Sequence, residues 1–178
     1  LSGTKGIDYL KSDIADMERM LDAYLAFARG EGNEMPAPTN VSAMLDEVIG
    51  HARRKGAIID LHTEGDIVVP VRPNAFKRCV TNLVENADRY GAHVSVRAGR
   101  RGDTVEIVVD DDGPGIPEDK REDAFRPFYR IENSRNPETG GVGLGLTIAR
   151  DVIRGHGGDI LLSESPAGGL RARVVLPI

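Results

Sequence analysis

The sequence contains no tryptophan and a single cysteine, and aromatic residues make up only 4% of its 178 positions. Hydrophobic residues still make up 40%, so the chain can bury a core, which must be mainly aliphatic. The lone Cys79 excludes an internal disulfide. Because it lies in an apolar helical pattern, we expect a buried, inert thiol in a reducing compartment. No apolar run approaches the roughly 18 residues of a membrane span, and no signal-peptide pattern is present, so we expect a cytoplasmic domain without direct membrane contact.

The net charge of −5 argues against nucleic acid as a partner, since phosphate backbones recruit lysine and arginine. A local basic cluster, "HARRKG" at 51–56, is better explained as the end of a helix, with Gly56 as the stop. The length predicts one domain, or one domain with an appendage. The chain starts at Leu1 rather than methionine, so we expect a fragment of a longer protein.

The first thirty residues carry a narrow apolar stripe with alternating spacings of three and four. Its members are Ile7, Leu10, Ile14, Met17, Leu21, Tyr24 and Ala28. This heptad pattern predicts a helix over 6–29 that pairs with other helices. An alternative is a helix that lies on its own globular domain. A turn-rich segment with two prolines follows and predicts a linker over 31–40, which leaves 41–178 as the main domain.

Helical and strand-like segments then alternate. The patterns predict helices over about 41–55, 74–90 and 144–155, short strands within 57–62 and 66–71, a hairpin of 93–98 with 104–110, and a final hairpin of 159–165 with 169–177. A polar stretch with weak periodicity occupies 113–142. We therefore predict an α/β two-layer sandwich, in which helices cover one face of a mainly antiparallel mixed sheet.

The glycine-rich segment "GGVGLGLT", 140–147, has part of the spacing of a P-loop. Leu146 occupies the position of the P-loop lysine, no strand directly precedes the segment, and the Rossmann pattern fails as well. What remains is a glycine run that opens a helix, where unpaired N–H groups can hold an anion without a lysine. Taken alone, a purely structural loop is an equal alternative.

Three acids end an apolar strand in "VEIVVDDDGPGIP". Successive strand side chains alternate faces, so the three carboxylates cannot converge on one metal, and we expect a single inward one, Asp111. A carboxylate at a strand end can accept a hydrogen bond from an amino group such as N6 of adenine. Gly113 and Gly115 would let a flat base approach the backbone. The alternative is an acidic turn.

A polar stripe runs along the helix 74–90 and comprises Asn82, Glu85, Asn86 and Arg89. Asparagine is a poor helix former, so two of them on one stripe suggest a function. An amide oxygen can supply one ligand to Mg²⁺, with phosphate oxygens and water completing the octahedron. Arg89 could then contact a phosphate, and Tyr90 could lie along a purine. A solvated helix face is the alternative.

Together these segments resemble a known family. "NLVENADRYG", "DDDGPGIP", "FRPFYR" and "GGVGLGLT", in this order, look like the N, G1, F and G2 boxes of sensor histidine kinases, especially osmosensor kinases of the EnvZ type. Each box alone is a weak signal, but four in order are a strong one. The resemblance implies the Bergerat-type ATP-binding fold that these kinases share with gyrase, Hsp90 and MutL. It also implies ATP and Mg²⁺ as cofactors.

The resemblance assigns roles box by box. Asn86 would bind Mg²⁺, and Glu85 would orient or deprotonate the acceptor imidazole. Asp111 would bind the adenine amino group, while Arg130 or Arg135, on a lid over 117–142 anchored by Phe125 and Phe128, would reach the γ-phosphate. The other implied ATP-binding residues are Asn82, Arg89, Tyr90, Gly113, Gly115, Ile116, Gly141, Val142, Gly143, Leu144, Gly145, Leu146 and Thr147.

The phosphoacceptor is the point where the sequence departs from the family. In such kinases the acceptor histidine is typically followed by an acid and then R-x-P, and none of the four histidines here fits. The helix 6–29 therefore resembles the second helix of a dimerisation hairpin, with the acceptor on a helix upstream of Leu1. This fragment is then expected to bind ATP but not to phosphorylate itself.

The implied partners are a response regulator receiver domain and, through the N-terminal helix of the full-length parent, a second copy. The parent could be an inner-membrane sensor with this domain on the cytoplasmic side. A nucleotide-gated interaction module without phosphotransfer is the alternative function. An Hsp90- or MutL-like ATPase is disfavoured, because the short lid with "FRPFYR" matches the kinases.

Overall fold

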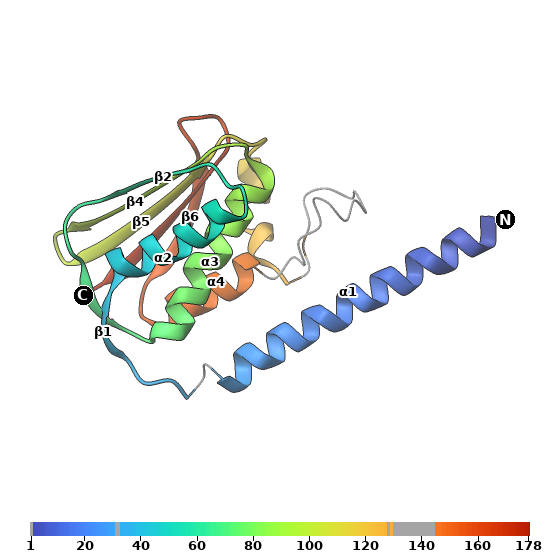
Figure 1. Ribbon diagram of the computed structural model, residues 1–178, viewed down its shortest axis with the longest axis horizontal. Coiled ribbons are helices and arrows are strands. Elements are labelled where there is room, and N and C mark those ends of the chain that lie inside the picture. The colour runs from blue at the N-terminus through green and yellow to red at the C-terminus, as the bar shows by residue number, and fades with distance from the viewer. Residues whose placement is uncertain (1, 31–32, 128, 130–144) are drawn as a thin grey trace.

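The computed structural model describes residues 2–30, 33–127, 129 and 145–178. Three helices, α2 (Val41–Arg54), α3 (Pro73–Tyr90) and α4 (Gly145–Gly155), form one layer in front of a sheet (Figure 1). The strands of that sheet are β2 (Ile59–Thr63), β4 (Val94–Arg101), β5 (Thr104–Asp111), β6 (Asp159–Glu164) and β7 (Leu170–Pro177). Two short 3₁₀ helices, η1 (Glu118–Lys120) and η2 (Asp123–Phe125), follow β5. The predicted two-layer α/β sandwich is confirmed.

The sheet has the order β2-β4-β5-β7-β6. The pair β2–β4 is parallel, and the other neighbours are antiparallel. A separate two-stranded sheet pairs β1 (Ala37–Asn40) with β3 (Val68–Val71). The central position of β5 matters for the site, because the carboxyl end of this strand carries the three acids.

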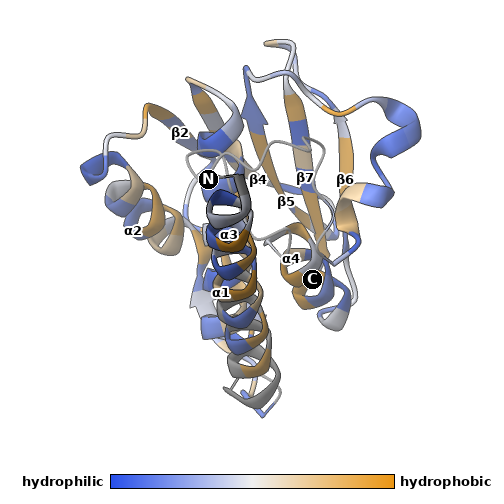
Figure 2. Ribbon diagram, turned by 90° about the vertical axis from the view of Figure 1, so that its right-hand side faces the viewer, coloured by the Kyte–Doolittle hydropathy of each residue, from blue (hydrophilic) through white to orange (hydrophobic). Residues whose placement is uncertain are grey.

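Side-chain periodicity explains how the two layers pack. In β5, Val105, Ile107 and Val109 are buried beneath the helices, as the two-residue alternation of a strand requires. In α3, Leu83 and Val84 are buried in the same core, and the polar stripe lies on another side of the helix. Figure 2 shows α3 between α2 and α4. The core is mainly aliphatic, as the composition requires.

The helix α1 (Ser2–Gly30) projects away from this sandwich (Figure 1). The stripe residues whose side chains are described remain exposed, namely Ile7, Leu10, Ile14, Met17 and Leu21. The helix is thus formed as predicted, and the alternative, a helix lying on its own domain, is not observed. None of the helices described combines the length and apolar character that a membrane crossing requires.

The predicted linker contains a strand and a helix cap. Ala37–Asn40 pair with β3, and the cross-strand partner of Pro38 is Pro70. Prolines are tolerated in such an edge pair because not every N–H takes part in the ladder. Just before it, the carboxylate of Glu34 accepts the N–H groups of Asn74 and Ala75, at 2.9 and 3.0 Å. This segment therefore ties the linker to the first turn of α3.

Two other local predictions are refined by the structure. The turn between β4 and β5 is shorter than 99–103, because Arg101 and Thr104 already pair and only Gly102 and Asp103 remain. Gly102 has a φ of +63°, which suits a two-residue hairpin turn. The basic cluster does end α2, with Gly56 at φ +101° just beyond.

Candidate functional site

Asp111 lies at the end of β5 with its side chain on the helix-covered face, as the alternation predicted. It is 3% exposed. Its Oδ1 accepts two main-chain hydrogen bonds, from the N–H of Gly113 at 2.9 Å and from that of Leu170 at 3.1 Å. Within the described part of the chain, no group donates to Oδ2. Burial raises the pKa of Asp111 above its usual value, and the two N–H donors only partly offset this.

Glycines surround this carboxylate closely. A Cβ at Gly169 would lie 2.2 Å from Asp111 Oδ1, and one at Gly91 would lie 2.9 Å from Asp111 Cβ. A Cβ at Gly113 would lie 2.4 Å from the carbonyl oxygen of Tyr90. The main chain therefore approaches Asp111 from three separate segments, and a side chain on any of them would displace a neighbour.

The two neighbouring acids point elsewhere. Asp110, on the other face of the sheet, forms a two-point ion pair with Arg171, with N–O distances of 2.8 and 2.9 Å. Asp112 accepts the N–H of Ala92 at 2.7 Å and that of His93 at 3.0 Å, and its Oδ2 lies 3.0 Å from the His93 ring. These contacts, those of His93 first, lower the pKa of Asp112. The three carboxylates do not form one metal site, as expected.

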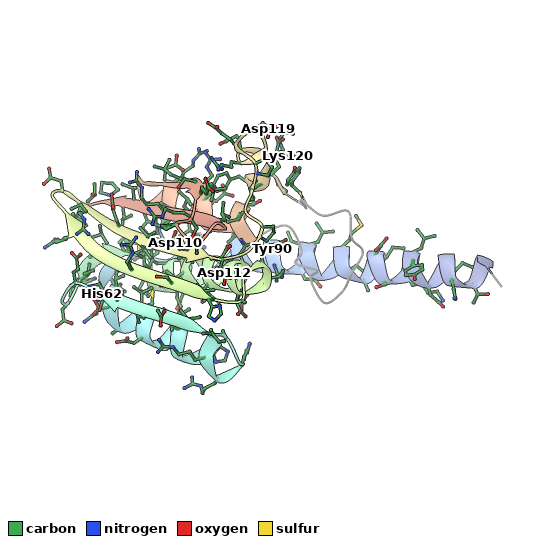
Figure 3. All side chains as sticks on the ribbon, turned by 90° about the horizontal axis from the view of Figure 1, so that it is seen from above. His62, Tyr90, Asp110, Asp112, Asp119 and Lys120 are labelled. Atoms are coloured by element: carbon green, nitrogen blue, oxygen red, sulfur yellow. The ribbon has the colours of Figure 1, made fainter. Side chains whose placement is uncertain are left out.

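The polar stripe of α3 lies beside the start of α4. Asn82 and Asn86 are half-buried, whereas Glu85 and Arg89 are exposed. A Cβ at Gly145, the first residue of α4, would lie 3.9 Å from the Cβ of Asn82. The opposite end of the stripe reaches the loop after β5, where Tyr90 lies against Gly113. Figure 3 shows Tyr90 and Asp112 at the same end of the sheet.

Several predicted residues of α4 and the G1 loop have side chains that are buried or already hydrogen-bonded. Ile116 and Leu146 are buried in the core. The hydroxyl of Thr147 donates to the carbonyl of Phe125 at 2.7 Å, which leaves its N–H for any anion at the start of α4. Gly115 has a φ of +71°, a conformation that favours glycine.

Phe125, expected to anchor the lid, is buried against α4. The guanidinium of Arg150 lies 4.0 Å from the centre of its ring. Arg150 also pairs with Glu122 at 2.6 Å and with Asp159 at 3.3 Å. These contacts fix 122–125 to α4. The other predicted residues of the lid and the G2 box lie outside the described residues, namely Phe128, Arg130, Arg135, Gly141, Val142, Gly143 and Leu144.

The donor set for a metal ion is limited. Among the described residues, no three His, Cys, Asp or Glu side chains gather as a metal site. The half-buried amides of Asn82 and Asn86 are neutral oxygen donors beside the helix start. They suit Mg²⁺ only if phosphate oxygens and water supply the remaining ligands. The residues present therefore fit a metal that arrives with a nucleotide.

The four histidines have structural or exposed positions. His51 is exposed on α2, His62 is exposed on β2, and His93 pairs with Asp112. His156 follows α4, where its Nδ1 lies 2.7 Å from the carbonyl of Val152 and its Nε2 accepts the N–H of Arg72 at 2.9 Å. Both ring nitrogens of His156 thus contact main-chain groups, as expected of a structural residue. The burial of Cys79, which raises its thiol pKa, agrees with an inert cysteine.

Comparison with known proteins identifies the family. The model of the family described as histidine kinase-, DNA gyrase B-, and HSP90-like ATPase matches residues 71–178, more than half of the chain. The chain therefore belongs to this family. The family match therefore supports ATP as the nucleotide of this domain.

The relatives narrow the class to sensor histidine kinases. The chain is 32% identical over 184 residues to the sensor histidine kinase CpxA of Escherichia coli K12, and 30% identical over 180 residues to the histidine-protein kinase BaeS of the same strain. These alignments cover 98% and 95% of the chain but only 40% and 38% of those relatives. The chain thus corresponds to less than half of the length of either relative.

Solved structures agree with this assignment. The kinase domain of the E. coli osmosensor EnvZ superposes with a TM-score of 0.63 at 37% identity, over 83% of this chain and 92% of that one. The mycobacterial sensor histidine kinase MprB gives 0.71 at 26% identity, over 80% and 97%. The expected resemblance is confirmed, and residues 71–178 form an ATP-binding catalytic domain of the sensor histidine kinase type.

Sequence reasoning missed three features of the site. The Leu170 N–H and Gly169 come from a turn far along the chain, and Gly91 belongs to the loop after α3. The dipeptide "GG" at 168–169 is the available signal, because paired glycines can mark a close main-chain approach as well as a turn.

Proposed function

We propose that this domain binds Mg-ATP and transfers the γ-phosphate to a histidine on a dimerisation helix, for relay to an aspartate of a response regulator. The observation that carries the nucleotide part is Asp111. Its carboxylate is buried, one oxygen is held by two N–H groups, and the other is left for a hydrogen-bond donor. The adenine amino group is such a donor, and the close approach of glycine main chain on the Oδ1 side supports a fixed orientation of the carboxylate.

The remaining roles follow from position. Asn86, with Asn82 beside it, would hold Mg²⁺, which when bound supplies charge neutralisation on the phosphates. Tyr90 would lie along the purine, and Arg89 and the N–H groups of α4 would hold phosphate oxygens. Arg130 or Arg135 would contact the γ-phosphate, and the N–H groups of 141–144 would continue the phosphate contacts from the G2 box.

The acceptor imidazole would attack the γ-phosphorus in line. A nitrogen–phosphorus bond forms as the bond from phosphorus to the β–γ bridging oxygen breaks, and ADP leaves with that electron pair. Glu85 is exposed on α3 and would take the proton from the attacking ring. None of the histidines described here is placed for this role, so the acceptor would belong to a segment outside these 178 residues.

We further propose the division 1–30, 31–40 and 41–178 as the second helix of a dimerisation hairpin, a linker and the catalytic domain. The exposed apolar stripe of α1 supports pairing with other helices. These would be the acceptor helix of the same hairpin and the helices of a second copy of the parent protein. A cytoplasmic location, with the parent an inner-membrane sensor, is part of this proposal.

Calorimetric titration with ATP, with and without Mg²⁺, tests the nucleotide part. Saturable binding that strengthens with Mg²⁺ is expected, and no binding in either condition would contradict the proposal. Phosphotransfer is tested by mixing this chain, ATP labelled at the γ-phosphate, and a longer chain that carries the upstream helix. Acid-labile phosphate on the longer chain is expected. ATP binding without any such phosphate would favour a nucleotide-gated interaction module.

A further inference from the structure

The strand β7 starts where β5 ends, and its first two residues contact two different acids. The N–H of Leu170 donates to Asp111 on the helix-covered face. The side chain of Arg171, the next residue, donates twice to Asp110 on the opposite face. The beginning of β7 is therefore held to the end of β5 from both sides of the sheet.

The pair Asp110–Arg171 is also the last cross-strand pair of this ladder. The ladder ends at this pair, and just beyond it the N–H of Leu170 donates to the side chain of Asp111. The ion pair is well shielded, since the side chain of Asp110 is 9% exposed and that of Arg171 is 26% exposed. Parallel N–H···O bonds of this kind fix orientation as well as distance.

The adjoining turn lies directly against the carboxylate. It is closed by hydrogen bonds from the N–H of Ser165 to the carbonyl of Gly169 at 2.8 Å and from the N–H of Gly168 to the carbonyl of Ser165 at 2.9 Å. The φ of Gly169 is not in the left-handed region, and a Cβ there would lie 2.2 Å from Asp111 Oδ1. Glycine is thus needed at 169 for space, and a small shift of this turn moves the Leu170 N–H relative to Oδ1.

We propose that Arg171 is a positioning residue for Asp111. By holding Asp110, it keeps the start of β7 in place, so that the Leu170 N–H occupies Oδ1 and Oδ2 is presented to the base. This inference rests on the proposed binding of adenine by Asp111. It assigns to an ion pair on one face of the sheet a role in the selectivity of Asp111 on the other face.

The consequence is a change in base discrimination. A fixed Oδ2 accepts from the adenine amino group and repels the carbonyl oxygen that hypoxanthine carries in its place. When β7 loosens, the carboxylate can rotate, and water can enter beside the unpaired Leu170 N–H. ATP then loses a well-directed hydrogen bond, whereas ITP never had one. The ratio of the two affinities should therefore fall.

Arg171→Met tests this, with Arg173→Met as the matched control. Arg173 lies two residues further along the same strand and face, but its contact with Glu106 is 3.9 Å long and its side chain is 43% exposed. In Arg171→Met we expect ATP affinity to fall by about threefold to tenfold, as for one lost hydrogen bond, with little change for ITP. Arg173→Met should leave both affinities unchanged.

A nucleotide-free readout separates this inference from the proposed function. Amide hydrogen exchange at Leu170, measured by NMR, should accelerate in Arg171→Met and not in Arg173→Met. Arg171→Lys is a second variant for the case that Arg171→Met does not fold. Lysine keeps the positive charge but cannot form two parallel hydrogen bonds, so it should show the same changes in affinity and exchange to a smaller extent. Unchanged Leu170 exchange in a folded Arg171 variant would overturn the inference. Altered exchange in a chain that binds no ATP would support the positioning role and contradict adenine binding.

Discussion

If Asp111 binds adenine as proposed, replacing it by asparagine should reverse the base preference of the site. Two N–H donors, of Gly113 and Leu170, converge on Oδ1. Asparagine has only one side-chain oxygen, which must stay at that position to satisfy both donors. Its NH₂ group then replaces Oδ2 and faces the adenine amino group, donor against donor. Turning the amide over would instead place the NH₂ group against the two N–H groups.

The loss of affinity can be estimated from the bond that disappears. A hydrogen bond to a charged group contributes about 1.5–3 kcal/mol, so the dissociation constant for ATP should rise by roughly tenfold to hundredfold. ITP presents a carbonyl oxygen at the position of the amino group. It should bind Asp111→Asn at least as tightly as ATP does, because the new NH₂ group can donate to this oxygen.

The same substitution should stabilise the ligand-free chain. Burial raises the pKa of Asp111, so the folded state holds this proton to a higher pH than the unfolded state does. The free energy of unfolding therefore falls as pH rises from the ordinary aspartate value of about 3.9 to the folded-state value, with about 1.4 kcal/mol for each unit between them. Asparagine removes this effect, so its Tm should be higher at pH 7, and the advantage should shrink as the pH approaches 4.

Calorimetry with ATP and ITP, together with thermal unfolding at several pH values, checks both parts. Asp112→Asn is the control, because Asp112 is the neighbouring acid but its carboxylate accepts the N–H groups of Ala92 and His93. It should leave the base preference unchanged. If the dissociation constant of Asp111→Asn for ATP lies within threefold of that of the unsubstituted chain, and the variant still rejects ITP, the proposed contact between Oδ2 and the amino group is wrong.

Three further predictions concern residues that cap or pack against the helices α3 and α4. Glu34→Gln removes the negative charge at the start of α3 and should lower the free energy of unfolding, measured in urea titrations, by roughly 0.5–1 kcal/mol. An unchanged free energy of unfolding would show that this helix cap does not stabilise the domain. Cys79 should react with a thiol reagent only as fast as the chain unfolds, and rapid modification in native buffer would contradict its burial. Arg150→Met loses the contact with the Phe125 ring and should destabilise the domain by about 1–2 kcal/mol in the same titration. Arg154→Met, at a more exposed arginine of the same helix, should have a smaller effect.

Local patterns were sufficient to predict most of the fold. The strands and helices with two-residue or helical periodicity, such as β5 and α3, appear within a few residues of the expected bounds. The inward direction of Asp111 followed from the alternation of β5 alone. The strand β1 was missed because prolines in "MPAPTN" are typical of loops, and only its pairing with β3 makes it a strand.

The environment of Asp111 could be predicted only in part. The residues of β5 and the following loop are adjacent in sequence, so their proximity was evident. The Leu170 N–H lies 59 positions away, and its contact depends on the β5–β7 register, which no local pattern specifies. Glu34 is likewise 41 positions from the amide of Ala75 that it caps. Such contacts arise from tertiary packing, and a sequence read segment by segment does not contain them.

Asp111 also illustrates how a buried charged group can oppose stability. An ionised carboxylate at this depth is unfavourable without a ligand, and its two N–H donors offset only part of the effect. A ligand amino group at Oδ2 would supply a further donor and favour the ionised form. Nucleotide binding should then stabilise the domain by the amount that its concentration and dissociation constant set, and it should shift the pKa of Asp111 downward. Under the proposed function, the charge that is unfavourable in the ligand-free chain would become a favourable contact in the ligand-bound one.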